Sequence, residues 1–386
     1  MRTITLLHVL LLLILHGTAT TIPPTPSRCT QTHGRVFTTP PSPSISMDWT
    51  HTSVSLSVSH TSSVSLSLTE TNDWKGLNGT LRSNSYLVSI TPSAPSSPSS
   101  PPFTLITHTS QSEYLLASDL DPNTHYVVHV TKLTEPDYNA VVASPSPVTI
   151  HAWIVDDSAL CLPFPSSPVD DDDDQPPPTR VLWVGDSITC GFCVLGEDGD
   201  PNTISYEDAS LTYWSTLCAD PDLNLDCRVM AWSGRGVVEN CTPGGVFMGS
   251  LVQRTLGSVS SSHYTAYDEW VPDVVSINLG TNDYGCGHTP PDHVFAHGYV
   301  ELASFLANPD SDPSRTLPRF ILGVGPMTHA YNTSTTQAAS TLRSLGLHVD
   351  LVLFPLLTSA TKGCLGHPNT HGQSDMASHL APLFTR

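Results

Sequence analysis

The feature that most constrains the fold of this chain is a short apolar run followed directly by Gly-Asp-Ser. Residues 181–184 read Val-Leu-Trp-Val, which is typical of a buried strand, and Gly185, Asp186 and Ser187 follow them directly. A serine hydroxyl at the carboxyl end of a strand stands where open α/β sheets present catalytic groups. Taken alone, the motif also fits an ordinary strand-to-helix turn, so its meaning depends on the segments that follow.

Two later segments contain the residue types that a serine nucleophile needs, an amide and an imidazole. Residues 280–283, Gly-Thr-Asn-Asp, follow the apolar run at 274–279, and His367-Pro368 precedes a helix-like segment near the carboxyl terminus. Serine is a poor nucleophile at neutral pH and requires a general base within hydrogen-bonding reach. Among the 18 histidines, His367 is our candidate base for Ser187, because Pro368 restricts the backbone beside it.

Acyl transfer also needs donors for the oxyanion that develops in its tetrahedral intermediate. Each such donor lowers the barrier by roughly 3 kcal/mol. Asn282 offers a side-chain amide, while Gly234 and Ser187 offer main-chain N–H groups. The Gly234 segment, Trp-Ser-Gly-Arg-Gly, is equally compatible with a plain turn. The order serine, glycine, asparagine and histidine nevertheless predicts acyl-transfer chemistry.

The chain divides into two halves of different texture. Residues 30–157 alternate polar and apolar side chains in short runs, which predicts an antiparallel β-sandwich; the clearest runs lie at 54–58, 64–68, 86–88, 103–106 and 126–130. Residues 180–386 alternate apolar runs with longer mixed segments, which predicts a parallel α/β sheet flanked by helices; the runs lie at 181–184, 274–279, 319–324 and 351–354. Residues 158–179 contain five consecutive aspartates followed, after Gln175, by three consecutive prolines. We expect an exposed linker there, because the segment is too charged and too stiff to join a core. A calcium site is the alternative, but a calcium loop spaces its ligands around a turn and does not place them in a consecutive run.

Composition and the amino terminus predict a secreted protein without nucleic-acid partners. Residues 1–20 resemble a cleavable signal peptide: Arg2 precedes an apolar stretch at 6–15, and small residues follow it. No later run is long and apolar enough to span a bilayer, and the carboxyl end has no lipid-anchor motif. The 386 residues include 15 Lys plus Arg against 35 Asp plus Glu, a formal charge of −20 that disfavours binding to a phosphate backbone. We expect an extracellular monomer.

The nine cysteines predict disulfides with at least one thiol left over. Their pairing cannot be deduced from the sequence. Cys190 and Cys193 lie just after the serine and leave a redox or metal site open, although secretion favours structural bridges. We expect no metal and no organic cofactor. Asn78, Asn240 and Asn332 begin glycosylation sequons.

The four motifs together resemble the SGNH hydrolases, also called GDSL esterases, over residues 181–386. More closely, the segments 185–191, 278–283 and 363–369 behind a β-sandwich look like family 2 carbohydrate esterases, with residues 120–134 resembling a pattern near the end of that family's sandwich. The resemblance implies a flavodoxin-like three-layer α/β/α domain preceded by a jelly-roll domain. It also implies a serine esterase that removes acetyl groups from xylan- or glucomannan-type carbohydrates through an acetyl-serine intermediate.

One departure from the family pattern concerns the base. Many relatives have an acid two or three residues before the histidine, whereas this chain has Leu365 and Cys364 there. Some members are understood to use a Ser-His dyad whose ring is held by a main-chain carbonyl, so we expect a dyad of Ser187 and His367. Asp375 is an alternative third member, although it falls in the predicted terminal helix.

Two other functions remain open at this point. The first is a broad-specificity GDSL lipase or esterase, which would need an apolar acyl channel. The second is a non-catalytic carbohydrate-binding protein in which the hydrolase half has lost its activity. The presence of Ser187, Asn282 and His367 argues against that loss.

Overall fold

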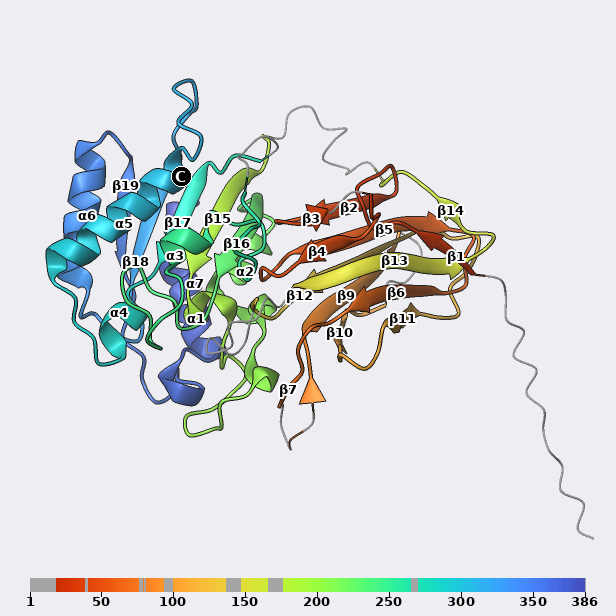
Figure 1. Cartoon of the computed structure of the whole chain (residues 1–386), viewed down its shortest axis with the longest axis horizontal. Coiled ribbons are helices and arrows are strands. Elements are labelled where there is room, and N and C mark those ends of the chain that lie inside the picture. The colour runs from red at the N-terminus through yellow and green to blue at the C-terminus, as the bar shows by residue number, and fades with distance from the viewer. Residues whose placement is uncertain are drawn as a thin grey trace, which may run out of the picture.

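Two bodies of different architecture lie side by side in the computed structural model of the chain, a β-rich amino-terminal half and an α/β carboxyl-terminal half (Figure 1). The structure describes residues 19–38, 41–75, 79, 81–93, 100–136, 147–165, 176–264 and 270–385.

The amino-terminal half contains two antiparallel sheets. In spatial order, the first consists of β11 (Glu113–Ala117), β6 (Val64–Thr69), β13 (Val148–Asp156), β4 (Ile45–Met47) and β3 (Phe37–Thr38), with β1 (Ala19–Ile22) also paired to β13. The second consists of β10 (Phe103–Ile106), β9 (Ser85–Pro92), β12 (Tyr126–Lys132), β5 (Ser53–Ser59) and β14 (Leu160–Cys161), with β2 (Thr30–His33) also paired to β5. A separate short pair is formed by β7 (Trp74–Lys75) and β8 (Leu81–Arg82).

The two sheets share one apolar core, as their alternating sequences require. On β5, Val54, Leu56 and Val58 are buried in the same cluster as Leu66 of β6 and Trp153 of β13, which belong to the other sheet. A side chain on every second residue of a strand points to the same face, so alternation places these apolar groups between the sheets. The predicted sheets are present, and their assignment as a jelly roll stays a prediction.

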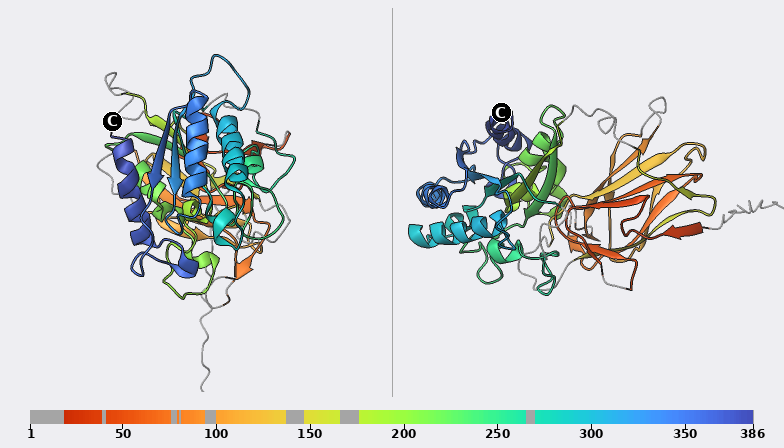
Figure 2. Two further views of the ribbon diagram at one scale, coloured as in Figure 1. Left: turned by 90° about the vertical axis from the view of Figure 1, so that its left-hand side faces the viewer. Right: turned by 90° about the horizontal axis from the view of Figure 1, so that it is seen from above.

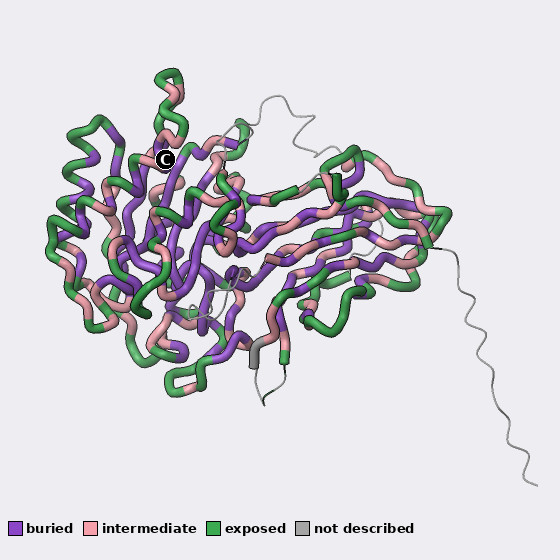
Figure 3. Tube along the Cα trace, in the orientation of Figure 1, coloured by how far each residue is buried: buried purple, intermediate pink, exposed green. Residues whose placement is uncertain are grey.

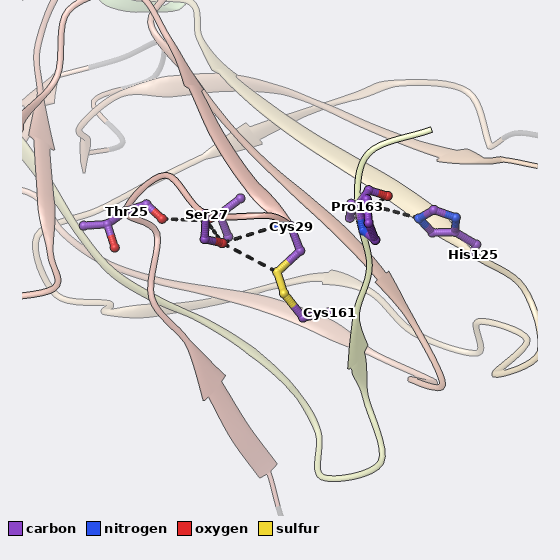
Figure 4. Close-up of a disulfide and its surroundings, with 8 residues drawn as sticks. Thr25, Ser27, Cys29, His125, Cys161 and Pro163 are labelled. Atoms are coloured by element: carbon purple, nitrogen blue, oxygen red, sulfur yellow. Dashed lines mark hydrogen bonds between the residues drawn. A yellow bond between two sulfur atoms is a disulfide. The ribbon is translucent and has the colours of Figure 1, made fainter. Parts of the chain in front are cut away.

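Pairing and a disulfide extend this half beyond its expected ends. Leu160 and Cys161, which we expected in the linker, pair with β5, and Cys161 forms a disulfide with Cys29 (Figure 4). Ala19 pairs with Asp156 although it falls within the expected signal peptide. The five aspartates at 170–174 and residues 1–18 lie outside the described part of the chain.

The carboxyl-terminal half is built on a parallel sheet, as predicted, and this sheet has five strands. Its order is β16 (Leu225–Ala231), β15 (Thr179–Gly185), β17 (Val274–Asn278), β18 (Arg319–Val324) and β19 (Val349–Leu353). This 2-1-3-4-5 order is that of flavodoxin-like folds. The strand β16 was not predicted, because Asp226 and Arg228 interrupt its apolar residues.

Helices cover both faces of this sheet (Figure 2). The α-helices described are α1 (Ser187–Cys190), α2 (Tyr213–Cys218), α3 (Met248–Leu251), α4 (Thr281–Gly285), α5 (Asp292–Ala307), α6 (Asn332–Ser344) and α7 (Thr370–Leu380). Among the described residues, 3₁₀ helices lie at Ile204–Tyr206, Ala209–Leu211, Cys364–Gly366 and Ala381–Leu383. On β15, Leu182 and Val184 face the core beneath α5 and α6, whereas Val181 and Trp183 face the core beneath α2 and α7. Buried residues therefore follow the strands in both halves (Figure 3).

Buried contacts also hold the two halves together. Trp49 of the sandwich belongs to the core of the α/β half, where its ring meets the edge of Trp232 with the ring centres 6.4 Å apart. The neighbouring Asp48 carboxylate accepts hydrogen bonds from the main-chain N–H groups of Gly257 at 3.0 Å and Ser258 at 2.9 Å. A buried carboxylate satisfied in this way fixes the register of the two halves.

All nine cysteines lie in the described residues and form four disulfides and one free thiol. The pairs are Cys29–Cys161, Cys193–Cys364, Cys218–Cys227 and Cys241–Cys286. Cys190 is free and buried, so of the two cysteines for which we favoured structural bridges, only Cys193 forms one. None of the described helices has the length and apolar character needed to cross a membrane.

Candidate active site

Ser187 is the first residue of α1 and lies at the carboxyl end of β15. Asp186 caps this helix, since its carboxylate accepts a hydrogen bond from the Ile188 N–H at 3.0 Å. Gly185 must lack a side chain, because a Cβ atom there would overlap the side chain of Thr189. The Gly-Asp-Ser motif thus makes a tight strand-to-helix turn, and Ser187 is only 4% exposed.

His367 reaches Ser187 from the loop between β19 and α7. Its Nε2 atom lies 2.8 Å from the Ser187 Oγ atom, which is hydrogen-bonding distance. Asn369 shapes this loop from both sides. Its side chain accepts hydrogen bonds from two N–H groups at the start of α7 and donates to the carbonyls of Ala360 and Lys362. The structure therefore brings the two predicted catalytic residues together.

Two further contacts hold the serine and histidine segments against each other. The Cys193–Cys364 disulfide joins the turn after α1 to the 3₁₀ helix that precedes His367. The Phe192 ring packs on the imidazole, with ring centres 4.8 Å apart. Neither contact could be predicted from the sequence, because each joins residues that are far apart in the chain.

A buried glutamine on α7 makes a third link. The Gln373 amide donates to the Ile188 carbonyl at 2.9 Å and accepts from the Tyr213 N–H at 2.9 Å. It thereby ties α7, which follows His367, to α1, which begins with Ser187. The sequence did not predict this role, because Gln373 is one of several polar residues in the segment that forms α7.

The imidazole of His367 has no acidic partner. Among the described residues, no side chain hydrogen-bonds its Nδ1 atom, and the acceptors beside the ring are the main-chain carbonyl groups of Cys364 and Leu365. Desolvation lowers the pKa of His367 to about 4, while the main-chain carbonyl groups of Cys364 and Leu365 act in the opposite direction. Asp375, the alternative third member, lies exposed on α7.

Asn282 and Gly234 lie in the segments that follow β17 and β16, the two strands that pair with β15. Asn282 is buried on α4, and its amide nitrogen donates to the Asp186 carboxylate at 3.1 Å and to the Arg235 carbonyl at 2.8 Å. Both amide hydrogens therefore have protein acceptors, with which an oxyanion would compete. Gly234 has a φ of 73°, a backbone conformation that favours glycine, and its carbonyl accepts from the Cys241 N–H at 2.9 Å.

Asp283 organises the loop behind Gly234. Its carboxylate accepts hydrogen bonds from the consecutive N–H groups of Val237, Val238 and Glu239, at distances of 2.8–3.1 Å. Burial raises the pKa of Asp283, and these hydrogen bonds oppose the rise. Its place beside Asn282 was the only sign in the sequence of this role.

Asp186 is the other buried acid of this region. Desolvation raises the pKa of Asp186 to about 7, and the nearby Asp283 carboxylate adds to the rise. Among the described residues, no group of three or more histidine, cysteine or acidic side chains is arranged to hold a metal ion.

Comparison with known proteins bears on the fold of the chain. No family model matches the chain. A family two carbohydrate esterase from Cellvibrio japonicus superposes with a TM-score of 0.72 at 18% identity, over 95% of this chain and 97% of that structure. The chain has the fold of the family 2 carbohydrate esterases. The resemblance carried by the sequence motifs is therefore confirmed.

Two curated relatives match parts of the sequence. An acetylxylan esterase / glucomannan deacetylase of Cellvibrio japonicus is 23% identical over 145 residues, which are 36% of this chain and 38% of that protein. The cellulase/esterase CelE of Acetivibrio thermocellus is 28% identical over 207 residues, which are 52% of this chain and 25% of that protein. The matched region thus spans well under half of either relative.

Proposed function

We propose that this protein is a secreted serine esterase that removes O-acetyl groups from polysaccharides or oligosaccharides of the xylan or glucomannan type. The observation that carries the proposal is the 2.8 Å contact between Ser187 Oγ and His367 Nε2 at the carboxyl edge of the parallel sheet. A serine hydroxyl in contact with an imidazole is the arrangement that acyl transfer requires.

The reaction runs in two halves. Ser187 Oγ attacks the acetyl carbonyl carbon while its proton passes to His367 Nε2, and a tetrahedral intermediate forms. The C–O bond to the sugar then breaks, and His367 returns the proton to the departing sugar oxygen. In the second half, water attacks the acetyl-serine with His367 again as base, and acetate leaves with Ser187 restored.

The oxyanion of both intermediates is assigned to the N–H groups of Ser187 and Gly234 and the amide of Asn282. The positions of Gly234 after β16 and of Asn282 after β17, on either side of the strand that leads to Ser187, support this assignment. Removing one such donor costs roughly 10²–10³-fold in kcat.

The base acts as part of a dyad. No carboxylate of the described residues bonds to the His367 ring, and its low pKa keeps the imidazole neutral near pH 7. A neutral imidazole is the form that accepts the serine proton.

The carbohydrate substrate and the secretion rest on different observations. The names of the two curated relatives include acetylxylan esterase, glucomannan deacetylase and esterase, which supports an acetylated plant-type glycan. Four disulfides within the described residues support an oxidising compartment. The signal-like residues 1–20 point the same way.

Acetate release from acetylated xylan and glucomannan tests this function. We expect release by the wild-type protein and none by Ser187→Ala, which loses one oxygen and should keep its melting temperature. An ester series then separates the glycan deacetylase from a lipolytic enzyme, since an apolar acyl groove gains roughly 0.8 kcal/mol for each buried CH₂. We expect kcat/KM to fall from acetyl to butyryl. Activity that rises towards octanoyl rejects the deacetylase, and release by Ser187→Ala rejects the nucleophile.

A further inference from the structure

The amino-terminal half contributes a carboxylate to the region immediately behind the candidate active site. After β12, residues 133–136 enter the boundary between the halves, and Glu135 is 2% exposed there. One of its carboxylate oxygens, Oε2, accepts a hydrogen bond from the Ser233 N–H at 2.5 Å. The same oxygen accepts the Cys190 S–H at 3.4 Å.

These two donors belong to the two segments that carry the proposed oxyanion N–H groups. Ser233 immediately precedes Gly234 in the turn after β16. Cys190 is the last residue of the four-residue helix that begins with Ser187. A single oxygen atom of the sandwich half thus binds both the segment that precedes Gly234 and the helix that begins with Ser187. It thereby sets the spacing between these two segments.

The segment that holds Glu135 is itself held rigidly. The ammonium group of Lys132, which is fully buried, donates to the carbonyls of Thr134 and Glu135, both at 2.7 Å. The Glu135 N–H donates to the Glu207 carboxylate at 2.6 Å. A side chain whose own backbone is fixed by buried hydrogen-bond partners loses little freedom when it binds a neighbouring loop.

We propose that Glu135 is a positioning residue for the oxyanion hole, and that the sandwich half thereby completes the active site. This inference rests on the esterase function proposed above. Glu135 touches neither substrate nor reacting atoms; it acts by holding the main chain at Ser233 and the end of α1. Displacement of an oxyanion donor affects the transition state more than the bound substrate, so the effect belongs in kcat.

A pair of variants of equal size isolates the hydrogen-bond acceptor. Glu135→Gln retains an oxygen that can accept a hydrogen bond from the Ser233 N–H, whereas Glu135→Met removes this acceptor. Neither variant has a carboxyl group at position 135. We expect kcat for an acetyl ester to fall about 10- to 100-fold in Glu135→Met, with KM within about twofold, and to stay within about fivefold in Glu135→Gln.

Glu70 provides the matched control. It is also a buried acid near Lys132, but the side chains that donate hydrogen bonds to it, Asn84, Tyr86 and Thr107, all lie in the sandwich half. Glu70→Gln and Glu70→Met should lower the melting temperature and leave kcat of the folded protein within about threefold. Equal losses of kcat in Glu70→Met and Glu135→Met overturn the proposal, and so does a Glu135→Met variant with wild-type kcat.

Amide hydrogen exchange supplies a readout that does not depend on turnover. Exchange at Ser233 and Gly234 should quicken in Glu135→Met and not in Glu70→Met. If the wild-type protein hydrolyses no acetyl ester, the esterase function fails while exchange still reports on the loop. Should Glu135→Met not fold, Glu135→Asp takes its place: it keeps the charge, withdraws the carboxylate by one CH₂, and should show the same loss of kcat and faster exchange. Unchanged exchange and kcat in that variant contradict the inference.

Discussion

Replacing Cys193 and Cys364 together with alanine should damage the Ser187–His367 contact as well as the stability of the fold. This disulfide is the covalent link between the turn after α1 and the segment that leads into His367. The Cys218–Cys227 disulfide offers a matched control, because it joins α2 to β16 and contacts neither catalytic candidate.

The expected loss of stability follows from the lengths of the two closed loops. The first disulfide closes 171 residues and the second only 9. On the chain-entropy estimate, these lengths correspond to about 5 and about 3 kcal/mol of unfolding free energy. Two other disulfides shorten the longer loop, but the dependence on length is logarithmic and the correction is only a few tenths of a kcal/mol. We therefore expect roughly 2 kcal/mol of difference between the two double variants.

Activity should separate the variants more sharply than stability. The 2.8 Å contact depends on a loop that the first disulfide holds in place, and a shift of about 1 Å can cost on the order of 10²-fold in rate. Guanidinium midpoints give the stabilities, and kcat/KM for 4-nitrophenyl acetate is measured well below both transitions. We expect a 10- to 100-fold loss for Cys193→Ala/Cys364→Ala and less than about threefold for the control. Equal losses in the two variants, or none in the first, would refute the argument that the disulfide holds the dyad.

Three smaller experiments test the local geometry. Gly185→Ala should abolish activity and lower the melting temperature, because its Cβ atom would overlap the Thr189 side chain. In the control Gly249→Ala, the new Cβ atom meets nothing within 4 Å, and the variant should be more stable by up to about 1 kcal/mol. A fully active Gly185→Ala would contradict the turn geometry. A profile of kcat/KM against pH should stay level until the pH falls towards the His367 pKa of about 4, and an acid limb near 6.5 would be inconsistent with a desolvated ring. Because the pKa of His367 is lower in the folded state than in the unfolded state, the unfolded state binds the proton more readily between about pH 6.5 and 4. The free energy of unfolding should therefore show no loss from His367 above about pH 6.5 and should decrease as the pH falls towards 4. Asp375→Asn should keep kcat/KM within about twofold, and a loss approaching roughly 10⁴-fold would identify a third member of the site.

The sequence was sufficient to predict which residues meet, because each motif follows a strand of one parallel sheet. The carboxyl ends of such strands share an edge, so Ser187 after β15 and Asn282 after β17 had to lie near each other. His367 required more, since a loop of about a dozen residues separates it from β19. The motif order and the helix that follows the histidine were enough to select it.

The contacts that hold the site in shape were not predictable, since they join residues without a common local pattern. Phe192 is an ordinary apolar residue in the sequence, and Gln373 an ordinary polar one on a helix. The partner of Cys193 could not be chosen among eight other cysteines. Glu135 lies in the other half of the chain, and only the packing of the two halves brings it to Ser233.

The buried acids of this site bind main-chain N–H groups instead of the imidazole. Asp186 caps α1 at Ile188, Asp283 binds three consecutive N–H groups behind Gly234, and Glu135 binds the Ser233 N–H. Each fixes a segment that carries or adjoins a proposed oxyanion donor. The imidazolium formed during the reaction then has no carboxylate partner, which agrees with the low pKa of His367. Such a site depends less on the strength of its base than on the prior alignment of its donors, because donors that are already fixed require no reorganisation when charge develops.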